Sequence, residues 1–273
     1  MSVVFLDESG SITVDFSDEE ICTIGGTTAN DAYNVFAERM NTIIAPFMAL
    51  MEDGSVTDEY RENFESEFNA GVMTGIEENI DNLCGVYLLV KYGSMRLEPS
   101  EILEYIARMP KSLQEMPIIE PVKTDAENSL KVAVGQPYTD ISGVDPEGNT
   151  LSLSSLVGEG RWVLVDFWAT WCGPCRAEIV ELKKAYDKYS TKGFEVLGVS
   201  LDRNQEAWRT FLVEEEIKWV GINDMDDEGK MPSAVAYGVK FIPTNILISP
   251  SGEIVVNTND WSEVEAKLIE IFE

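Results

Sequence analysis

The chain has 273 residues, of which 44% are hydrophobic and 25% charged, and its formal net charge is −29. This length allows one large domain or two ordinary ones, and the composition is typical of a soluble globular protein. The acidic field repels phosphate backbones and anionic membranes, so we expect no nucleic acid among the partners. Histidine is absent, which removes the commonest general base and metal ligand and excludes Ser-His and Cys-His catalysis within this chain.

The cysteines and the first residues set further bounds. Cysteines occur at positions 22, 84, 172 and 175, without the paired spacing of a zinc site, so we predict no bound metal. No apolar run approaches the length of a membrane span. Residues 1–7 have neither the basic region nor the cleavage pattern of a signal peptide, and the chain starts in strand-like sequence. We therefore expect natural sequence upstream of Met1 to be missing.

The first half of the chain predicts short strands followed by helices. The strand-like segments, each only a few residues long, are 3–6, 11–16 and 21–24, with a turn at 8–10. The helical segments, which carry apolar residues at helical spacing, are 31–51, 57–82, 83–92 and 101–109. Pro46 lies inside the first helix and is expected to kink or split it. We expect the apolar stripes to form an intramolecular core, and the alternative is that they grip a partner.

Three prolines among polar residues indicate a linker at 110–131. We therefore divide the chain into a mainly helical domain with a small β remnant, 1–130, and a second domain, 131–273. The second domain alternates strand-like segments, at 162–168, 195–200, 219–222, 245–248 and 253–256, with helical segments at 173–191, 205–216, 232–237 and 263–272. This order implies an α/β fold with a mixed sheet covered on both faces.

The segment 162–176 carries the chemistry. A strand-like run ends in Cys172-Gly173-Pro174-Cys175, and an amphipathic helical pattern follows at once. A helix N-terminus offers unpaired N–H groups and the positive end of the dipole, which favour a thiolate over a thiol. The thiolate is the form that attacks disulfides. The arrangement therefore indicates a redox site, in preference to a static disulfide or half a zinc site.

The sequence V-D-F-W-A-T-W-C-G-P-C-R closely resembles the active site of the thioredoxin superfamily. The C-x-x-C-R-x-E run and the G-V-S-L-D after the next strand resemble the extracytoplasmic TlpA/ResA branch. The first half is similar to the accessory domain that precedes such thioredoxins in Bacteroides-type bacteria. The resemblance implies a thioredoxin-like fold for 131–273, protein-disulfide oxidoreductase activity, and a periplasmic or cell-envelope location. It implies no cofactor other than the redox-active pair Cys172–Cys175.

Roles for three residues follow from the helix position and from the resemblance. Cys172, at the exposed first turn of the helix, is expected to attack the substrate, and the partly buried Cys175 is expected to resolve the mixed disulfide. Asp166 lies in an apolar strand, where a carboxylate is costly unless it is paired or neutral, so we expect a raised pKa. The resemblance makes Asp166 the proton acceptor for Cys175, and the alternative is a satisfied structural aspartate.

Substrate-binding residues are implied by the same resemblance. The Ile242–Pro243 bond is expected to be cis and to lie against the cysteines, so that the Ile242 backbone pairs with an extended substrate. Trp171, Gly173 and Pro174 are expected to shape the rim.

Five further positions carry weaker expectations. Arg176 and Glu178 are expected to be surface or rim charges with a modest effect on Cys172, and Val180 stands where the family often has a proline that bends the helix. Cys22 and Cys84 are expected to be buried thiols, with a structural disulfide between them as the alternative.

Gly173-Pro174 adds no positive charge between the cysteines, so the thiolate is less stabilised and the couple less oxidising than in strong disulfide donors. We therefore favour a reductase or disulfide-exchange role, with protein thiols or disulfides as substrates and a soluble or membrane-bound thiol as electron donor. The helical half is a candidate for self-association. The alternatives are a peroxidase on the same fold, whose P-x-x-x-T-x-x-C setting is absent, and a binding or chaperone-like module that carries an auxiliary thioredoxin-like domain.

Overall fold

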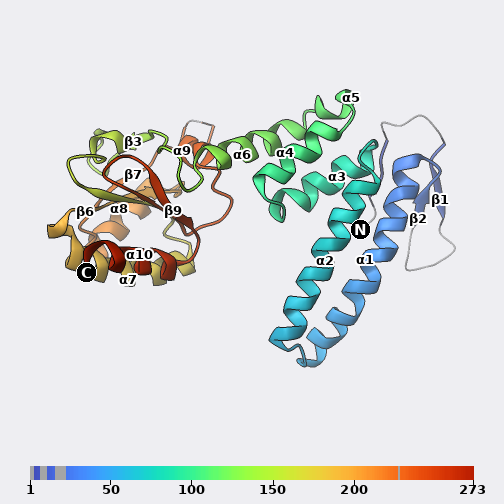
Figure 1. Ribbon diagram of the computed structural model, residues 1–273, viewed down its shortest axis with the longest axis horizontal. Helices are drawn as coiled ribbons and strands as arrows, with labels where there is room; N and C mark the ends of the chain where they lie inside the picture. Colours follow the sequence, from blue (N-terminus) through green and yellow to red (C-terminus); the bar gives the residue numbers. More distant parts are fainter. Residues whose placement is uncertain (1–2, 7–10, 16–22, 227) are drawn as a thin grey trace. The chain divides into compact units, whose positions relative to one another are not determined.

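The computed structural model describes residues 3–6, 11–15, 23–226 and 228–273. The chain divides into two compact units, Met1–Ala126 and Glu127–Glu273, and each is described by itself (Figure 1). Among the described residues, none of the helices has both the length and the apolar character needed to span a membrane.

The first unit begins with a small antiparallel pair, β1 (Thr13–Asp15) and β2 (Thr23–Gly25). The expected strand at 3–6 is wrong. The Asn30 side chain explains why, because it accepts from the Phe5 N–H at 3.1 Å and donates to the Phe5 carbonyl at 3.0 Å, taking the place of a strand partner. The expected turn at 8–10 and Cys22 lie outside the described residues.

Helices make up the rest of this unit. They are α1 (Thr28–Asp53), α2 (Asp58–Glu78), α3 (Leu83–Lys91), the 3-10 turn η1 (Gly93–Met95), α4 (Pro99–Arg108), α5 (Lys111–Gln114) and α6 (Ile119–Lys131), of which α6 contains the division between the units. α1 begins after the capping residue Thr27 and ends at Gly54, which adopts a φ of 72° that glycine tolerates. Pro46 does not split α1. The proline removes only one backbone hydrogen bond, and packing on either side of it holds the helix together.

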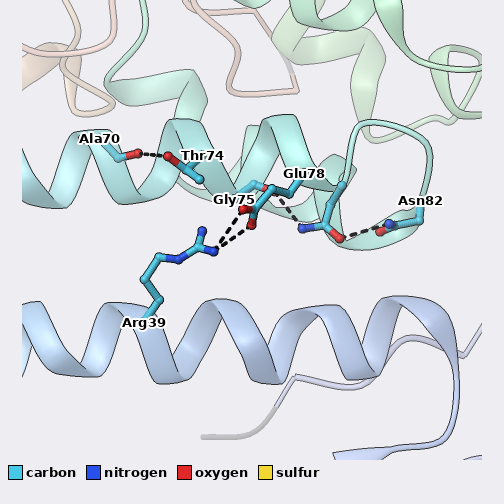
Figure 2. Close-up of polar contacts among 7 residues, drawn as sticks. Arg39, Ala70, Thr74, Gly75, Glu78 and Asn82 are labelled. Atoms are coloured by element: carbon cyan, nitrogen blue, oxygen red, sulfur yellow. Dashed lines mark hydrogen bonds and ion pairs between the residues drawn. The ribbon is translucent and has the colours of Figure 1, made fainter.

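α1 and α2 form an antiparallel hairpin whose helices approach closely. A Cβ atom on Gly75 would lie 2.6 Å from Cδ2 of Phe36, and one on Gly71 would lie 2.8 Å from Sδ of Met40. Figure 2 shows Arg39 of α1 reaching across to Glu78 of α2, with contacts of 2.8 and 3.1 Å to the two carboxylate oxygens. The Phe36 ring leaves no room for a side chain at Gly75, whereas the flexible Met40 side chain can shift to admit one at Gly71. The expected helix–helix core is confirmed.

Two asparagines build the corner between α2 and α3. Asn79 donates from Nδ2 to the Gly75 carbonyl at 2.8 Å, and Asn82 donates to Oδ1 of Asn79 at 3.1 Å (Figure 2). The Asn82 side chain also accepts from the Cys84 N–H at 2.9 Å and so caps α3. Cys84 itself is fully buried in the core of this unit.

The expected linker at 110–131 is wrong, because most of it is helical. Pro121 lies in the first turn of α6, where an N–H has no partner within the helix, so proline costs little there. Ile119, Val122 and Ala126 of α6 are buried in the core of the first unit. Their apolar spacing outweighs the proline content that indicated a linker.

The second unit has a five-stranded mixed sheet in the order β7-β6-β5-β8-β9. Its strands are β5 (Trp162–Trp168), β6 (Phe194–Ser200), β7 (Val220–Ile222), β8 (Thr244–Ile248) and β9 (Ile254–Thr258), and a separate hairpin pairs β3 (Ser142–Val144) with β4 (Thr150–Ser152). The central β5 runs parallel to β6 and antiparallel to β8. The helices are α7 (Gly173–Tyr189), α8 (Gln205–Glu214), α9 (Pro232–Ala236) and α10 (Trp261–Phe272), with 3-10 turns η2 (Leu153–Ser155) and η3 (Ser190–Lys192). The predicted α/β class with a thioredoxin-like sheet is confirmed.

Two hydrophobic clusters cover the two faces of this sheet. One contains Leu164 and Trp168 of β5 together with residues of α7 and α10. The other contains Val163, Val165 and Phe167 of β5. Since side chains alternate along a strand, Asp166 lies on the same face as Leu164 and Trp168, which is the face that α7 covers.

Candidate active site

The two cysteines lie where β5 leads into α7. Cys172 is the N-cap of α7, and its Sγ accepts from the Cys175 N–H at 3.2 Å. The two form a disulfide with their Cα atoms 5.3 Å apart. Cys175 is buried, as expected, but Cys172 is only 5% exposed, so its expected exposure is wrong. The Ile242 segment explains this burial, because its carbonyl oxygen lies 3.7 Å from Sγ of Cys172.

The Ile242–Pro243 bond is cis, as the sequence analysis expected. Side chains hold the carbonyls on either side of Ile242: Thr244 donates from Oγ1 to the Phe241 carbonyl at 2.6 Å, and Asn259 donates from Nδ2 to the Pro243 carbonyl at 2.5 Å. The Ile242 carbonyl is left facing Cys172, where a reduced thiol can donate to it. The segment therefore presents backbone polar groups beside the sulfur.

A buried carboxylate fastens the loop before Cys172. Asp202 accepts from the Thr170 N–H at 3.0 Å, from the Thr170 hydroxyl at 2.6 Å and from the Ser200 hydroxyl at 2.9 Å. These bonds tie the loop at the end of β5 to the end of β6. This role was not predicted, since the G-V-S-L-D run was interpreted only as a family signature. The signal was present as an aspartate two residues after a buried strand.

Asp166 lies buried on the face of the sheet that α7 covers, and its Oδ1 has no hydrogen-bond partner among the described residues. Burial raises its pKa well above the ordinary range, and the nearby charge of Glu178 raises it further. The expected rise in the pKa of Asp166 is therefore confirmed. A carboxyl group of this kind keeps its proton to higher pH than an exposed aspartate does.

The expectation that Glu178 is a surface charge is wrong. Glu178 is partly buried on α7 and accepts from Nδ2 of Asn245 at 2.6 Å. Burial raises its pKa, the Asn245 bond lowers it, and the charge of Asp260 raises it. Glu178 follows Cys175 by three residues, which places it on the helix side that faces the sheet. Asn245 pairs with Asp166 in the β5–β8 register, so a polar cluster forms behind the disulfide.

The rim around the cysteines is apolar and exposed. Trp171 is 69% exposed and Phe241 53% exposed, and Gly173 and Pro174 are also exposed. Trp171, Gly173 and Pro174 were predicted from the sequence, whereas Phe241 was not, because its only signal was its place next to Ile242. This rim offers an apolar surface on both sides of the sulfur.

Two other expectations concern α7. Arg176 is exposed, with its guanidinium 5.5 Å from the centre of the Phe211 ring, in agreement with its expected surface position. Val180 is exposed, and α7 continues through it without interruption.

Across the described ranges, no three His, Cys, Asp or Glu side chains lie together in a way that would hold a metal ion.

Comparison with known proteins places this site in context. Residues 134–257 match the AhpC/TSA family. The chain is 37% identical over 106 residues to thiol-disulfide oxidoreductase ResA of Oceanobacillus iheyensis. The matched residues make up 39% of this chain and 52% of that protein. It is 32% identical over 126 residues to ResA of Bacillus anthracis, covering 46% of this chain and 69% of that protein. The chain is also 32% identical over 144 residues to ResA of Halalkalibacterium halodurans. This match covers 50% of this chain and 75% of that protein.

Solved structures are similar over the same share of the chain. The thioredoxin domain of a thiol-disulfide oxidoreductase from Bacteroides vulgatus is 34% identical with a TM-score of 0.45, covering 50% of this chain and 98% of that domain. A thiol:disulfide interchange protein from Bacteroides sp. is 32% identical with a TM-score of 0.45. This match covers 52% of this chain and 91% of that protein.

Proposed function

Because the chain belongs to the family of ResA-like thiol-disulfide oxidoreductases, we propose that it reduces or exchanges protein disulfides through Cys172 and Cys175. One observation supports this most directly: the pair caps α7 beside the cis Ile242–Pro243 segment, with Asp166 buried behind it. We assign Cys172 as the nucleophile, Cys175 as the resolving thiol, Asp166 as the proton acceptor and the Ile242 backbone as the docking edge.

The first step uses Cys172 as the nucleophile. In the reduced protein its thiolate is stabilised by the Cys175 N–H and by the positive end of the α7 dipole. The thiolate attacks one sulfur of the substrate disulfide, forms a mixed disulfide and releases the other substrate sulfur as a thiolate.

The second step uses Cys175 and Asp166. Asp166 accepts the proton of the Cys175 thiol, and the Cys175 thiolate then attacks Sγ of Cys172. The bond from Cys172 to the substrate breaks, the second substrate thiolate leaves, and the Cys172–Cys175 disulfide forms. Two electrons pass from the dithiol to the substrate, and an external thiol donor must return two electrons for the next turnover. Glu178 acts on this step through its charge, which raises the pKa of Asp166.

The docking edge defines the substrate class. The Ile242 backbone pairs with an extended polypeptide, and Trp171, Gly173, Pro174 and Phe241 contact the side chains next to the substrate cysteine. Gly173 and Pro174 add no positive charge, so the couple favours reduction or exchange. The donor is a soluble or membrane-bound thiol of the periplasm or cell envelope, and residues 1–130 form an accessory domain.

An insulin-reduction assay on the full chain, supplied with a dithiol reductant, tests the proposal. Cys172→Ser abolishes the catalysed rate, because no other thiol in the site is positioned to attack. Cys175→Ser forms a mixed disulfide that persists under non-reducing conditions, because the resolving thiol is missing. Cys22→Ser removes a thiol from the first unit and serves as the matched control with an unchanged rate. Equal rates for the wild type and Cys172→Ser would overturn the proposal.

A further inference from the structure

The distal part of the α1–α2 hairpin carries an apolar surface outside the core of the first unit. Its members, which we call the hairpin face, are Phe47, Met48, Met51, Tyr60 and Phe64. None of them belongs to the core cluster, and Met48 and Met51 are 52% and 45% exposed. Figure 1 shows α3 and α4 at the opposite end of the hairpin from the turn that joins α1 to α2. Among the described residues of this unit, no third helix packs over the hairpin face.

Aromatic rings run along the hairpin in a continuous series. The ring centre of Phe68 lies 5.8 Å from that of Phe64, Phe64 lies 3.9 Å from Phe47, and Phe47 lies 6.4 Å from Tyr60. The guanidinium of Arg96 sits 4.8 Å from the centre of the Phe68 ring, at the core end of the series. Within the described residues, no cation lies over the rings of Phe64, Phe47 or Tyr60. Arg96 is thus the one cation placed on this series of rings, while Phe47, Phe64 and Tyr60 stack on one another and stay half-buried.

The charge around the hairpin face has one sign. Segment 41–68 contains seven carboxylates and one cation, Arg61. The carboxylates, all exposed, are Glu52, Asp53, Asp58, Glu59, Glu62, Glu65 and Glu67. None of the seven takes part in an ion pair within the described residues. An acidic border around an apolar centre is complementary to a partner that carries both apolar groups and cations.

We infer that the hairpin face docks a cationic, amphipathic polypeptide segment in which Lys or Arg side chains accompany large apolar ones. The apolar side chains cover Met48 and Met51, whose flexible thioethers adapt to different shapes. The cations reach the ring faces and the bordering carboxylates. A second copy of this chain does not fit, because it would bring an equally acidic border against this one. The hairpin face belongs to the first unit, whereas Cys172 and Cys175 belong to the second, and the inference does not depend on the chemistry of the cysteines.

Fluorescence anisotropy of labelled synthetic peptides with the full chain tests the inference. An amphipathic peptide of leucine and lysine binds, and the same peptide with glutamate in place of lysine does not. The double variant Met48→Ser/Met51→Ser weakens binding of the lysine peptide by about tenfold or more, because the apolar centre is lost. Met95→Ser, at a methionine that is 55% exposed elsewhere in the same unit, is the matched control and leaves the Kd unchanged.

A charge variant separates this docking from general acidity. Glu62→Gln/Glu65→Gln weakens binding and reduces its salt dependence more than Glu38→Gln/Glu120→Gln, which removes two exposed carboxylates outside the hairpin border. Circular dichroism establishes that each variant is folded. Equal affinity of the folded wild type and the methionine double variant would overturn the inference. So would a dimer, seen by analytical ultracentrifugation, that Met48→Ser/Met51→Ser dissociates.

Discussion

At the scale of single residues, the carboxyl group of Asp166 is buried and one of its oxygens has no hydrogen-bond partner among the described residues. Both burial and the charge of Glu178 raise its pKa. In the unfolded chain an aspartate titrates near a pKa of about 3.9. As pH rises, the unfolded chain therefore releases this proton at a lower pH than the folded protein does, so the group couples stability to pH.

The replacement Asp166→Asn tests both consequences. Because the folded pKa is raised, the contribution of Asp166 to stability is complete below the unfolded pKa and is lost as pH rises through the folded pKa. The free energy of unfolding of the wild type therefore falls as pH rises, in part because of Asp166. Asp166→Asn increases the free energy of unfolding at neutral and alkaline pH and removes the part of this fall that Asp166 causes. Urea unfolding across the pH range measures it. Asp58→Asn, at an exposed carboxylate of α2, is the control, and an equal decline in Asp166→Asn and the wild type would contradict the assignment.

The same variant changes the rate of resolution. A protonated Asp166 cannot accept the Cys175 proton, so the wild-type rate rises as pH increases through the raised pKa. Loss of the acceptor lowers the rate by about one to two orders of magnitude and removes this rise. Stopped-flow release of a reduced peptide substrate follows the step. A pH profile unchanged by Asp166→Asn would show that the aspartate is only structural.

At the scale of elements, the α1–α2 hairpin depends on the absence of a side chain at Gly75. The atoms that a Cβ would meet are Cδ2 of Phe36 at 2.6 Å and Cδ1 of Leu88 at 3.0 Å, both in the packed core. We expect Gly75→Ala to lower the free energy of unfolding by about 1–3 kcal/mol, even though alanine favours a helix more than glycine does. The urea midpoint measures the loss. Thr74→Ala, at the exposed neighbouring position, is the control, and a stabilising Gly75→Ala would contradict the close packing.

The spacing of apolar residues predicts helices and strands well where a single periodicity dominates the segment. The strand at 162–168 and the start of the helix at 173 are confirmed, since a run of apolar residues ends at a C-x-x-C with proline in the first helical turn. The strand at 3–6 and the linker at 110–131 are wrong, because contacts with Asn30 and with the core of the first unit outweigh the local pattern there. Glu178 is misplaced for a related reason: a charged side chain on an inward helical position is accepted when a distant Asn245 is there to donate to it.

At the scale of the whole molecule, the redox site and the sheet that holds it lie within residues 127–273. Both clusters that cover the sheet also lie within this range. We expect the fragment 127–273 to fold and to reduce a small disulfide at the rate of the full chain. Thermal unfolding by circular dichroism and a small-disulfide assay check this. A folded but inactive fragment would show that the first unit contributes to the chemistry.

The sequence by itself determined the chemistry of this protein: two cysteines at the start of a helix after a buried strand, no histidine to replace them, and a proline before a later strand. These features depend on neighbouring residues and on helix electrostatics. Only the tertiary structure decided which groups surround the sulfur. The partners of Thr170, Asn245 and Cys172 lie 32, 67 and 70 residues away along the chain, so no local periodicity records them. The burial of Cys172 and the polar cluster behind it arise from those distant contacts, which form only when the sheet and α7 pack together.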